Sequence, residues 1–421
     1  MERYEVVVVG GGFAGVAGAS AAARQGAKVL LIEKGGSLGG AATNALVNPF
    51  MLNATKIDGK TTELSQGIFR EICLNLLKKD AVVFSESGFT RFSEETLKFV
   101  LDDMTTEAGV DVLFHSYLCG VKKNGDTVKA VEVATKRGIY SVAADYFIDA
   151  TGDAQLSFLA GCPFELGRKK DGLCQPMTLC FRLGNVDTER FFQSRAHLNE
   201  EYKKALEAGK LINPRENVLV FRTTQAGVLH LNTTRIIKLD PTSPVDLSKA
   251  EKLARKQVLE IYEFMKEHAD GLENSFLMMT APEIGVRESR KIVGDYVLTE
   301  RDCRAFTKFP DAVAACQYDI DIHSPDGTGT SHYYFPEGEY YTVPYRSLIP
   351  KGVENMLVAG RCISSDQGAQ ASFRIMPTVC TLGEAAGIAA ALAVKGKCSV
   401  RQIDVSSLQE ILKENGAFIG I

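Results

Sequence analysis

A glycine-rich turn between a buried strand and a helix is the feature that most constrains this chain of 421 residues. Residues 5–9 form a continuous apolar run of β-branched type, which is typical of a parallel strand buried on both faces. Residues 10–15 follow in the spacing G-x-G-x-x-G, and residues 13–25 are rich in helix-forming alanine. Because residues 28–33 then form a second apolar strand, the sequence predicts a βαβ unit at this end of the chain.

The glycines of this turn have separate physical roles in binding a dinucleotide. Gly10 permits the tight turn, Gly12 lets the backbone approach a pyrophosphate, and Gly15 lets the helix pack on the strand. The helix N-terminus favours the diphosphate through its free N–H groups and its dipole. Glu33 ends the second strand, where a carboxylate accepts hydrogen bonds from ribose hydroxyls and repels a 2′-phosphate. The sequence therefore predicts a dinucleotide site, the alternative being a purely structural turn.

Composition and charge exclude several other classes of protein. The chain is 45% hydrophobic and 24% charged, with 48 Lys+Arg against 52 Asp+Glu, so it has no general basic footprint for nucleic acid or anionic lipid. No uninterrupted apolar stretch approaches the roughly 20 residues of a membrane span, and no signal-peptide pattern precedes the first strand. The ten cysteines include no C-x-x-C pair. We expect a cytoplasmic protein with a small-molecule substrate, without a metal site, nucleic-acid partner or membrane insertion, and able to form oligomers.

The middle of the chain predicts an antiparallel meander and then a separate domain. Short strands are expected at 117–121, 127–134 and 139–142, the first two joined by an Asn-Gly hairpin turn, and residues 146–150 return as a buried strand. From about 165 to 340 the glycine signature is absent and aromatic and charged residues increase.

Polar residues mark the expected helix starts. Ser93 precedes apolar residues at helical spacing, Ser248 opens a capping box, and Ser406 starts the last helix. A long helix is expected from about Pro377 to Val394. Its preceding residue, Met376, cannot cap it, so its free N–H groups suit an anionic ligand edge unless Thr378 is the cap.

Residues 10–40, which end in a second glycine pair, resemble the FAD-binding fingerprint of glutathione-reductase-type flavoproteins. Three further stretches resemble the FAD-dependent oxidoreductases that are related to fumarate reductase flavoproteins: residues 147–161, 281–302 and 356–393. The resemblance implies an α/β fold: a glutathione-reductase-type FAD/NAD(P)-binding, Rossmann-like domain with a β-meander crossover, plus an inserted α+β substrate domain. It implies an FAD domain from 1–165 and 345–421 and a substrate or cap domain at 166–344, with 48–90 contributing to the substrate side.

The same resemblance implies a bound FAD. After Gly40 there is neither a cysteine pair nor a histidine for covalent attachment, so we expect noncovalent FAD. An Ala-Thr-Gly turn is implied near the diphosphate, Gly360 and Arg361 near the ribitol, Leu118 at the adenine, and the helix start at the flavin N1/C2=O edge. The expected cofactor contacts are Gly10, Gly12, Phe13, Ala14, Gly15, Glu33, Lys34, Gly39, Gly40, Ala41, Ala42, Thr43, Leu118, Ala150, Thr151, Gly152, Asp153, Gly360, Arg361, Met376 and Thr378.

Candidate catalytic residues lie in the second half of the chain. Arg287 and Arg290 are three apart, so on a helix they share a face and can bind a substrate carboxylate or stabilise negative charge; the alternative is an internal ion-pair network. His323 is a candidate proton donor or acceptor, the alternative being an aromatic-rich domain interface. Arg374 precedes the long helix and can reach substrate or flavin.

Taken with these residues, the resemblance implies an FAD-dependent oxidoreductase. We expect two-electron hydride transfer between noncovalent FAD and a small organic substrate, with a diffusible electron donor or acceptor because no second strand-embedded G-x-G-x-x-G is present. The alternative is an FAD-containing protein that modifies or binds nucleic acid. Such proteins usually have a basic patch, whereas the longest basic run here is residues 168–170.

Overall fold

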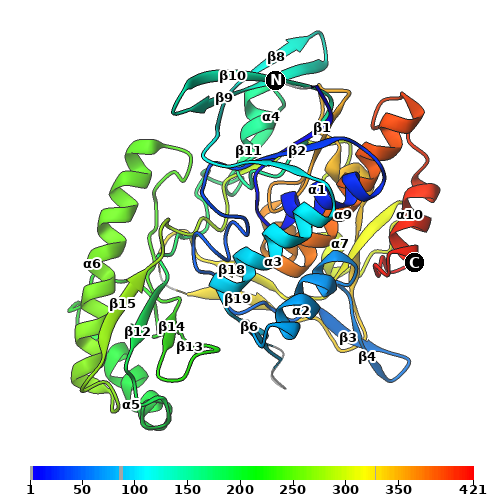
Figure 1. The fold of residues 1–421 in the computed structure, drawn as a ribbon. Coiled ribbons are helices and arrows are strands. Elements are labelled where there is room, and N and C mark those ends of the chain that lie inside the picture. The colour runs from blue at the N-terminus through cyan, green and yellow to red at the C-terminus, as the bar shows by residue number, and fades with distance from the viewer. Residues whose placement is uncertain (1–2, 85–88, 328) are drawn as a thin grey trace.

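In the computed structural model, which describes residues 3–84, 89–327 and 329–421, the largest sheet has seven strands (Figure 1). Its parallel part has the order β7 (Asp111–Leu113), β2 (Val29–Ile32), β1 (Tyr4–Val9), β10 (Gly138–Asp149) and β21 (Met356–Val358). Strands far apart in the sequence therefore lie side by side. The predicted α/β class and the parallel βαβ unit are confirmed.

Strand β10 belongs both to the parallel sheet and to the meander. Its first half pairs antiparallel with β9 (Thr127–Thr135), which pairs antiparallel with β8 (Tyr117–Asn124), and its second half pairs parallel with β1. The predicted meander is confirmed. The separate strands predicted at 139–142 and 146–150 are one continuous strand, since no turn-forming glycine or proline interrupts it.

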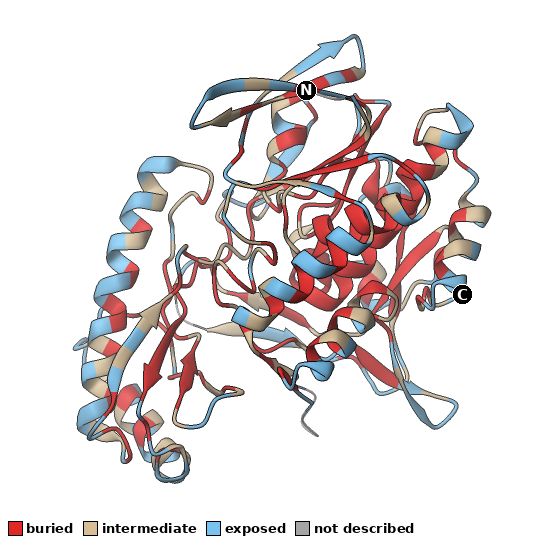
Figure 2. Cartoon of the chain, viewed as in Figure 1, coloured by how far each residue is buried: buried red, intermediate tan, exposed pale blue. Residues whose placement is uncertain are grey.

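Both faces of the parallel strands are buried (Figure 2). Val6 and Val8 pack in the core that contains α1 (Phe13–Arg24) and α3 (Glu94–Glu107), whereas Val7 and Val9 pack in the core shared with the meander. This alternation is the period of two of a β-strand. A continuous apolar run is therefore the pattern that a central strand needs.

Helix α9 (Met376–Gly396) packs closely against α1 through glycines. A Cβ added at Gly383 would lie 2.1 Å from the Ala14 carbonyl oxygen, and one added at Gly387 would lie 2.1 Å from the Gly18 carbonyl oxygen. By length and composition α9 could cross a membrane, but 89% of its most apolar window is buried inside the protein. It is the core helix of this domain.

We expect Gly387→Ala to lower the free energy of unfolding by about 2 kcal/mol, because the added methyl group forces the two helices apart. Urea unfolding followed by circular dichroism measures the loss. Gly396→Ala is the control in the same helix, since its added Cβ would meet only the Cys398 thiol, at 3.2 Å. Equal losses in the two variants would show that the α1–α9 contact is not the cause.

A second hydrophobic core lies beside the first domain (Figure 1). It joins residues 177–286 and Leu46 around a sheet of order β13 (Val220–Arg222), β14 (Leu229–Leu231), β12 (Phe181–Gly184) and β15 (Phe276–Thr280). Helices α5 (Thr188–Glu207) and α6 (Pro244–His268) cover this sheet.

The two cores favour a substrate unit smaller than the expected 166–344. Ala314 in β17 (Ala312–Cys316) and Tyr341 in β20 (Tyr341–Pro344) pack into the core of the FAD-type domain, not into the second core. We therefore propose 177–286 as the inserted unit.

The helix starts show where local signals were misleading. Ser93 caps α3 as predicted, but α6 begins after Ser243, so Ser248 lies inside the helix and donates to the Pro244 carbonyl at 2.8 Å. Asp404, not Ser406, caps the last helix. A serine followed by an acidic residue or glutamine is therefore not sufficient to define a start. The remaining elements are α2 (Ile68–Lys78), α4 (Gln155–Leu159), α7 (Glu300–Arg304), α8 (Gln367–Phe373), α10 (Val405–Glu414), η1 (Tyr345–Leu348) and the paired strands β3 (Ala54–Ile57) with β4 (Lys60–Glu63), β5 (Val82–Val83) with β6 (Arg91–Phe92), β11 (Phe164–Leu166) with β16 (Arg290–Ile292), and β18 (Ile320–His323) with β19 (Thr330–Tyr333).

Candidate active site

A cavity of about 1130 Å³ extends from the glycine-rich turn to the second unit. Pockets for one small molecule usually measure roughly 300–1000 Å³, so this cavity has room for a large cofactor and a substrate. Met51 and Phe89, from the segment 48–90, also line it. The predicted cofactor residues that line it are Gly10, Gly12, Phe13, Ala14, Glu33, Lys34, Gly39, Gly40, Ala41, Ala150, Thr151, Gly152, Asp153, Gly360, Arg361 and Met376.

The glycine turn opens its backbone toward the cavity. Gly10 has φ +103°, and a Cβ there would lie 2.5 Å from the Ala150 carbonyl oxygen. A Cβ at Gly12 would meet no heavy atom closer than the Gly40 Cα, at 4.0 Å, so it would project into free space. Gly12 is also the N-cap of α1 and makes no side-chain cap. Free N–H groups at a helix start beside this space fit a diphosphate.

Glu33 is held at the end of β2 by backbone donors. The Gly11 N–H donates to its Oε2 at 2.6 Å and the Gly35 N–H donates to its Oε1 at 2.7 Å. The side chain is 5% exposed and lines the cavity. Since a carboxylate oxygen can accept more than one hydrogen bond, both atoms can still accept from ribose hydroxyls.

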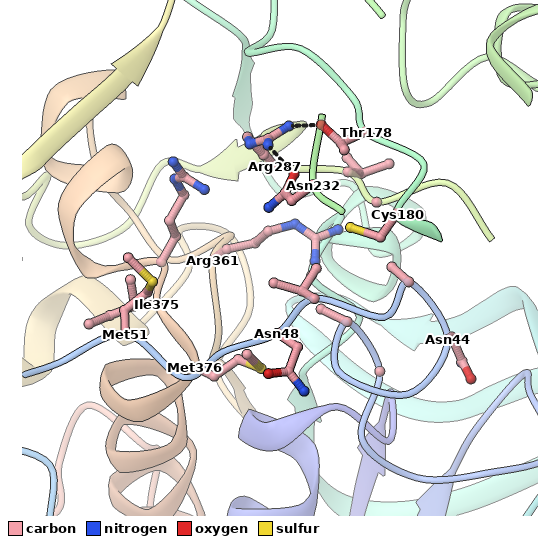
Figure 3. A pocket seen from close by; sticks show the side chains of 18 of the residues that line it. Asn44, Asn48, Met51, Thr178, Cys180, Asn232, Arg287, Arg361, Ile375 and Met376 are labelled. Carbon is pink, nitrogen blue, oxygen red and sulfur yellow. Dashed lines mark hydrogen bonds between the residues drawn. The ribbon is translucent and has the colours of Figure 1, made fainter. Parts of the chain in front are cut away.

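The start of α9 also faces the cavity, near Asn48 and Met51 (Figure 3). Its N-cap is Ile375, one residue before the predicted Met376, and neither side chain can accept a hydrogen bond. Thr378 lies inside the helix, where its hydroxyl accepts from Asn53 at 3.2 Å. The alternative that Thr378 caps the helix is therefore wrong, and the free N–H groups at this end adjoin the cavity.

Some of the predicted cofactor contacts do not line the cavity. Gly15 faces the Gly10 carbonyl oxygen, 1.7 Å from an added Cβ, and the Thr43 hydroxyl donates to the Leu38 carbonyl at 2.8 Å. Leu118 packs in the core between the meander and the sheet. These residues shape the turn or fill the core, and Gly15 allows the close helix packing that its position predicted. The predicted contacts that do not line the cavity are Gly15, Ala42, Thr43, Leu118 and Thr378.

The two candidate arginines do not share a face. Arg287 lies in irregular chain and reaches the cavity, donating to the Pro176 carbonyl at 2.7 Å, to the Thr178 hydroxyl and to Asn232 Oδ1 at 3.2 Å (Figure 3). Arg290 instead begins β16, and its guanidinium lies 4.2 Å from the centre of the Phe158 ring. It does not line the cavity. The helix assumed for this segment is absent, so the predicted pairing is wrong.

His323 and Arg374 line the cavity around Asp321. Arg235 Nη2 lies 3.2 Å from His323 Nδ1, and because an arginine only donates, Nδ1 must accept. The proton is then on Nε2, 3.3 Å from Asp321 Oδ2. Burial, followed by repulsion from Arg287, lowers the pKa of His323 to about 3, so the ring is neutral. Arg374 lies 3.5 Å from the same carboxylate oxygen.

Sequence reasoning missed Asp321, Tyr318 and Arg215, which also line this end of the cavity. Asp319, Asp321 and His323 are two residues apart, a spacing that puts their side chains on one face of a strand. This polar stripe was the available signal. Arg215 stands in a segment without periodicity, and no local signal marks it.

Two buried histidines are expected to make the fold sensitive to acid. Burial, followed by repulsion from Arg182, lowers the pKa of His230 to about 3, as in His323. Below about pH 6.5 the unfolded chain binds protons that the folded protein does not, so stability falls as pH falls from about 6.5 to about 3. Between about pH 7.5 and 5.5 each histidine costs about 1.4 kcal/mol.

His230→Leu should therefore reduce the loss of stability on acidification by about 1.4 kcal/mol, measured by urea unfolding at the two pH values. An unchanged loss would mean that His230 is not a source of the acid sensitivity.

The chain matches the family model "FAD dependent oxidoreductase" over residues 5–412. This protein is an FAD-dependent oxidoreductase. The family predicted from the glycine and Ala-Thr-Gly motifs is thus confirmed, and with it the FAD cofactor and an enzymatic role. None of these findings supports the nucleic-acid alternative.

Solved structures share the fold of this oxidoreductase. A geranylgeranyl bacteriochlorophyll reductase-like protein from Thermoplasma acidophilum is 16% identical, with a TM-score of 0.50 over 98% of this chain and 84% of that chain. p-Nitrophenol 4-monooxygenase from Pseudomonas putida is 11% identical, with a TM-score of 0.50 over 99% of this chain and 94% of that chain.

One relative is similar in sequence over part of its length. Digeranylgeranylglycerophospholipid reductase 1 from Methanococcoides burtonii is 27% identical over 158 residues, which are 36% of this chain and only 38% of that protein.

Proposed function

We propose that this oxidoreductase transfers two electrons, as a hydride, between noncovalent FAD and a small organic substrate. The observation that supports this is the cavity itself, which joins the uncapped starts of α1 and α9 to a group of buried polar side chains on the second unit. FAD, when bound, supplies the redox chemistry of its isoalloxazine ring. The protein then has to bind the substrate, orient it and exclude water.

The starts of the two helices would hold opposite ends of the cofactor. The Gly12 end of α1, with Glu33 beside it, fits the diphosphate and ribose, and the Met376 end of α9 fits an edge that gains negative charge. Arg361 also lines the cavity (Figure 3). Its Nη2 lies 2.6 Å from Asp153 Oδ1. We assign cofactor contact to the lining residues named above.

Arg287 and Arg374 would orient the substrate in the cavity, Arg374 from beside the start of α9. Both line it, and Arg287 is held by neutral partners that leave its charge available. His323 has its nitrogens engaged with Arg235 and Asp321, so we assign it a positioning role: it fixes Asp321, which in turn holds Arg374. Proton transfer to substrate by His323, as the sequence suggested, would first require that it leave both partners.

Anaerobic flavin reduction tests the proposed function. The FAD-loaded protein is mixed with candidate donors, and bleaching of the flavin absorbance is followed; the reduced protein is then mixed with candidate diffusible acceptors, oxygen among them. A full two-electron bleach by a small organic donor, and reoxidation by a separate acceptor, are expected. Bleaching that stops at one electron with every donor would contradict hydride transfer.

We further propose that the protein works in the cytoplasm. All ten cysteines lie among the described residues and are free thiols, which suits a reducing compartment. We also propose that the protein can form oligomers. The molecular mass of the purified protein in solution tests this.

A further inference from the structure

The substrate end of the cavity contains more positive charge than its carboxylates compensate. Asp321 lies 3.5 Å from Arg374, and Glu216 lies 3.1 Å from Arg235. The other acidic residues that line the cavity also have partners: Asp153 pairs with Arg361, Glu283 with Lys34, Glu251 with Arg255, and Glu33 accepts from backbone N–H groups. No lining carboxylate in the described chain is thus left without a partner.

This pairing leaves out Arg215, which is buried, and Arg287, which is half-buried. In the described part of the chain, no carboxylate oxygen lies within 4.0 Å of either guanidinium. Among the described residues, the only side-chain hydrogen bond of Arg215 is from Nε to Asn217 Oδ1, at a long 3.4 Å, although the residue is just 5% exposed. Arg287 donates to neutral oxygens alone. The Nε of nearby Arg374 is buried without a partner.

Such an arrangement is unfavourable without a ligand. A buried charge loses its hydration and needs a counter-charge, and two like charges repel each other. Burial, with repulsion from Arg374 and from Arg215 itself, lowers the pKa of Arg287 to about 9, and burial with repulsion from Arg235 lowers that of Arg215 to about 10. The guanidinium groups are nevertheless charged at neutral pH. An anion placed among them would relieve both penalties.

We propose that the cavity binds its substrate through a group carrying two negative charges, a dicarboxylate or a phosphate monoester, held between Arg215 and Arg287 beside Arg374. Two uncompensated cations call for two negative charges, and the planar guanidinium fork matches the oxygens of either group. This inference rests on the proposed function, because it takes the arginine end of the cavity as the substrate side. It adds the chemical class of the substrate and a residue, Arg215, that no motif marks.

Binding of small dianions to the FAD-loaded protein tests the inference without any turnover. Malonate and inorganic phosphate are the probes, and malonamide is their neutral counterpart; thermal stabilisation and perturbation of the flavin absorbance are the readouts. One dianion at least should bind, and which one does distinguishes a carboxylate from a phosphate substrate. Failure of both to bind, or binding of malonamide with equal affinity, would overturn the inference.

Charge-neutral variants locate the binding. Arg215→Gln and Arg287→Gln should each weaken dianion affinity at least about tenfold. Arg195→Gln is the matched control, since Arg195 lines the same cavity but lies over the Phe192 ring, 5.9 Å from its centre; its affinity should be unchanged. An equal loss in all three variants would reduce the effect to general electrostatics and refute the site.

Folding and function are checked in the same samples. FAD content and thermal midpoint without ligand show that Arg215→Gln is folded, and removal of an uncompensated buried charge should leave the midpoint equal or higher. If Arg215→Gln loses FAD, Arg215→Lys is used instead. Lysine keeps the positive charge and loses only the planar guanidinium group. A tenfold weaker affinity for the dianion is again expected. Arg215-dependent dianion binding without flavin reduction by any donor would refute the proposed function and leave this site standing.

Discussion

Gly12→Val is expected to produce a folded protein that no longer retains FAD. A side chain at this position would project into the cavity, because the Gly40 Cα at 4.0 Å is the nearest heavy atom to an added Cβ. The Gly12 backbone has φ −72°, which valine adopts without strain. The substitution is therefore expected to weaken FAD binding and not the fold, because the diphosphate can no longer approach the free N–H groups at the start of α1. Loss of two such charge-assisted hydrogen bonds weakens FAD binding at least about a hundredfold.

The measurement separates cofactor loss from unfolding. FAD affinity is obtained by titrating the apoprotein, and the thermal midpoint of the apoprotein is recorded in parallel. Gly10→Ala is the contrasting variant, because its methyl group would meet the Ala150 carbonyl at 2.5 Å and its φ is +103°. We expect a lower apoprotein midpoint for Gly10→Ala and an unchanged one for Gly12→Val. Wild-type FAD affinity in Gly12→Val would place the diphosphate elsewhere.

Arg287→Met is expected to lower the rate of substrate-dependent flavin reduction by about two orders of magnitude and to leave the FAD content unchanged. Its guanidinium is held in the cavity by Thr178 and Asn232 and has no carboxylate partner, so its charge is available to substrate. Loss of a charged hydrogen bond donor at a reacting group typically costs about 3 kcal/mol. Stopped-flow absorbance under anaerobic conditions gives the rate.

Arg290→Met is the matched control for this effect. It removes the same charge three residues away, but from a side chain that lies over Phe158 outside the cavity. Its rate of flavin reduction should stay within about twofold of the wild type, with at most a modest loss of stability from the lost ring contact. If Arg290→Met reduced the flavin slowly and Arg287→Met reduced it at the wild-type rate, Arg290 and not Arg287 would be the substrate-orienting arginine.

The lining of the cavity at the glycine-rich turn could be predicted from sequence because its signals are local. Gly10, Gly12 and Glu33 act within one βαβ unit, where a few consecutive residues determine both the turn and the approach of a ligand. The meander was also predictable, since a hairpin turn and alternating strands lie next to each other in the chain. The smaller second unit that we propose could not be predicted, because its boundary depends on which core β17 and β20 join.

The substrate side could not be predicted in the same way. Arg215, Arg287 and Asp321 come from three separate segments, and only the packing of the second unit on the FAD domain brings them to one cavity. Arg287 and Arg290 were assigned to a common helical face by their spacing, but the backbone around Gly285 pairs with Thr178 as an isolated β-bridge. Spacing of three indicates a shared face only once a helix is present.

The glycine contact between α1 and α9 has a consequence for the cofactor as well as for the fold. Each helix presents an uncapped start to the cavity, and their backbones touch with almost no side chain between them. These close backbone contacts therefore contribute to the distance between the two helix starts. A change at the contact between Gly18 and Gly387, more than one turn from either helix start, would alter that distance. We expect the dinucleotide affinity and the redox potential of the flavin to shift together.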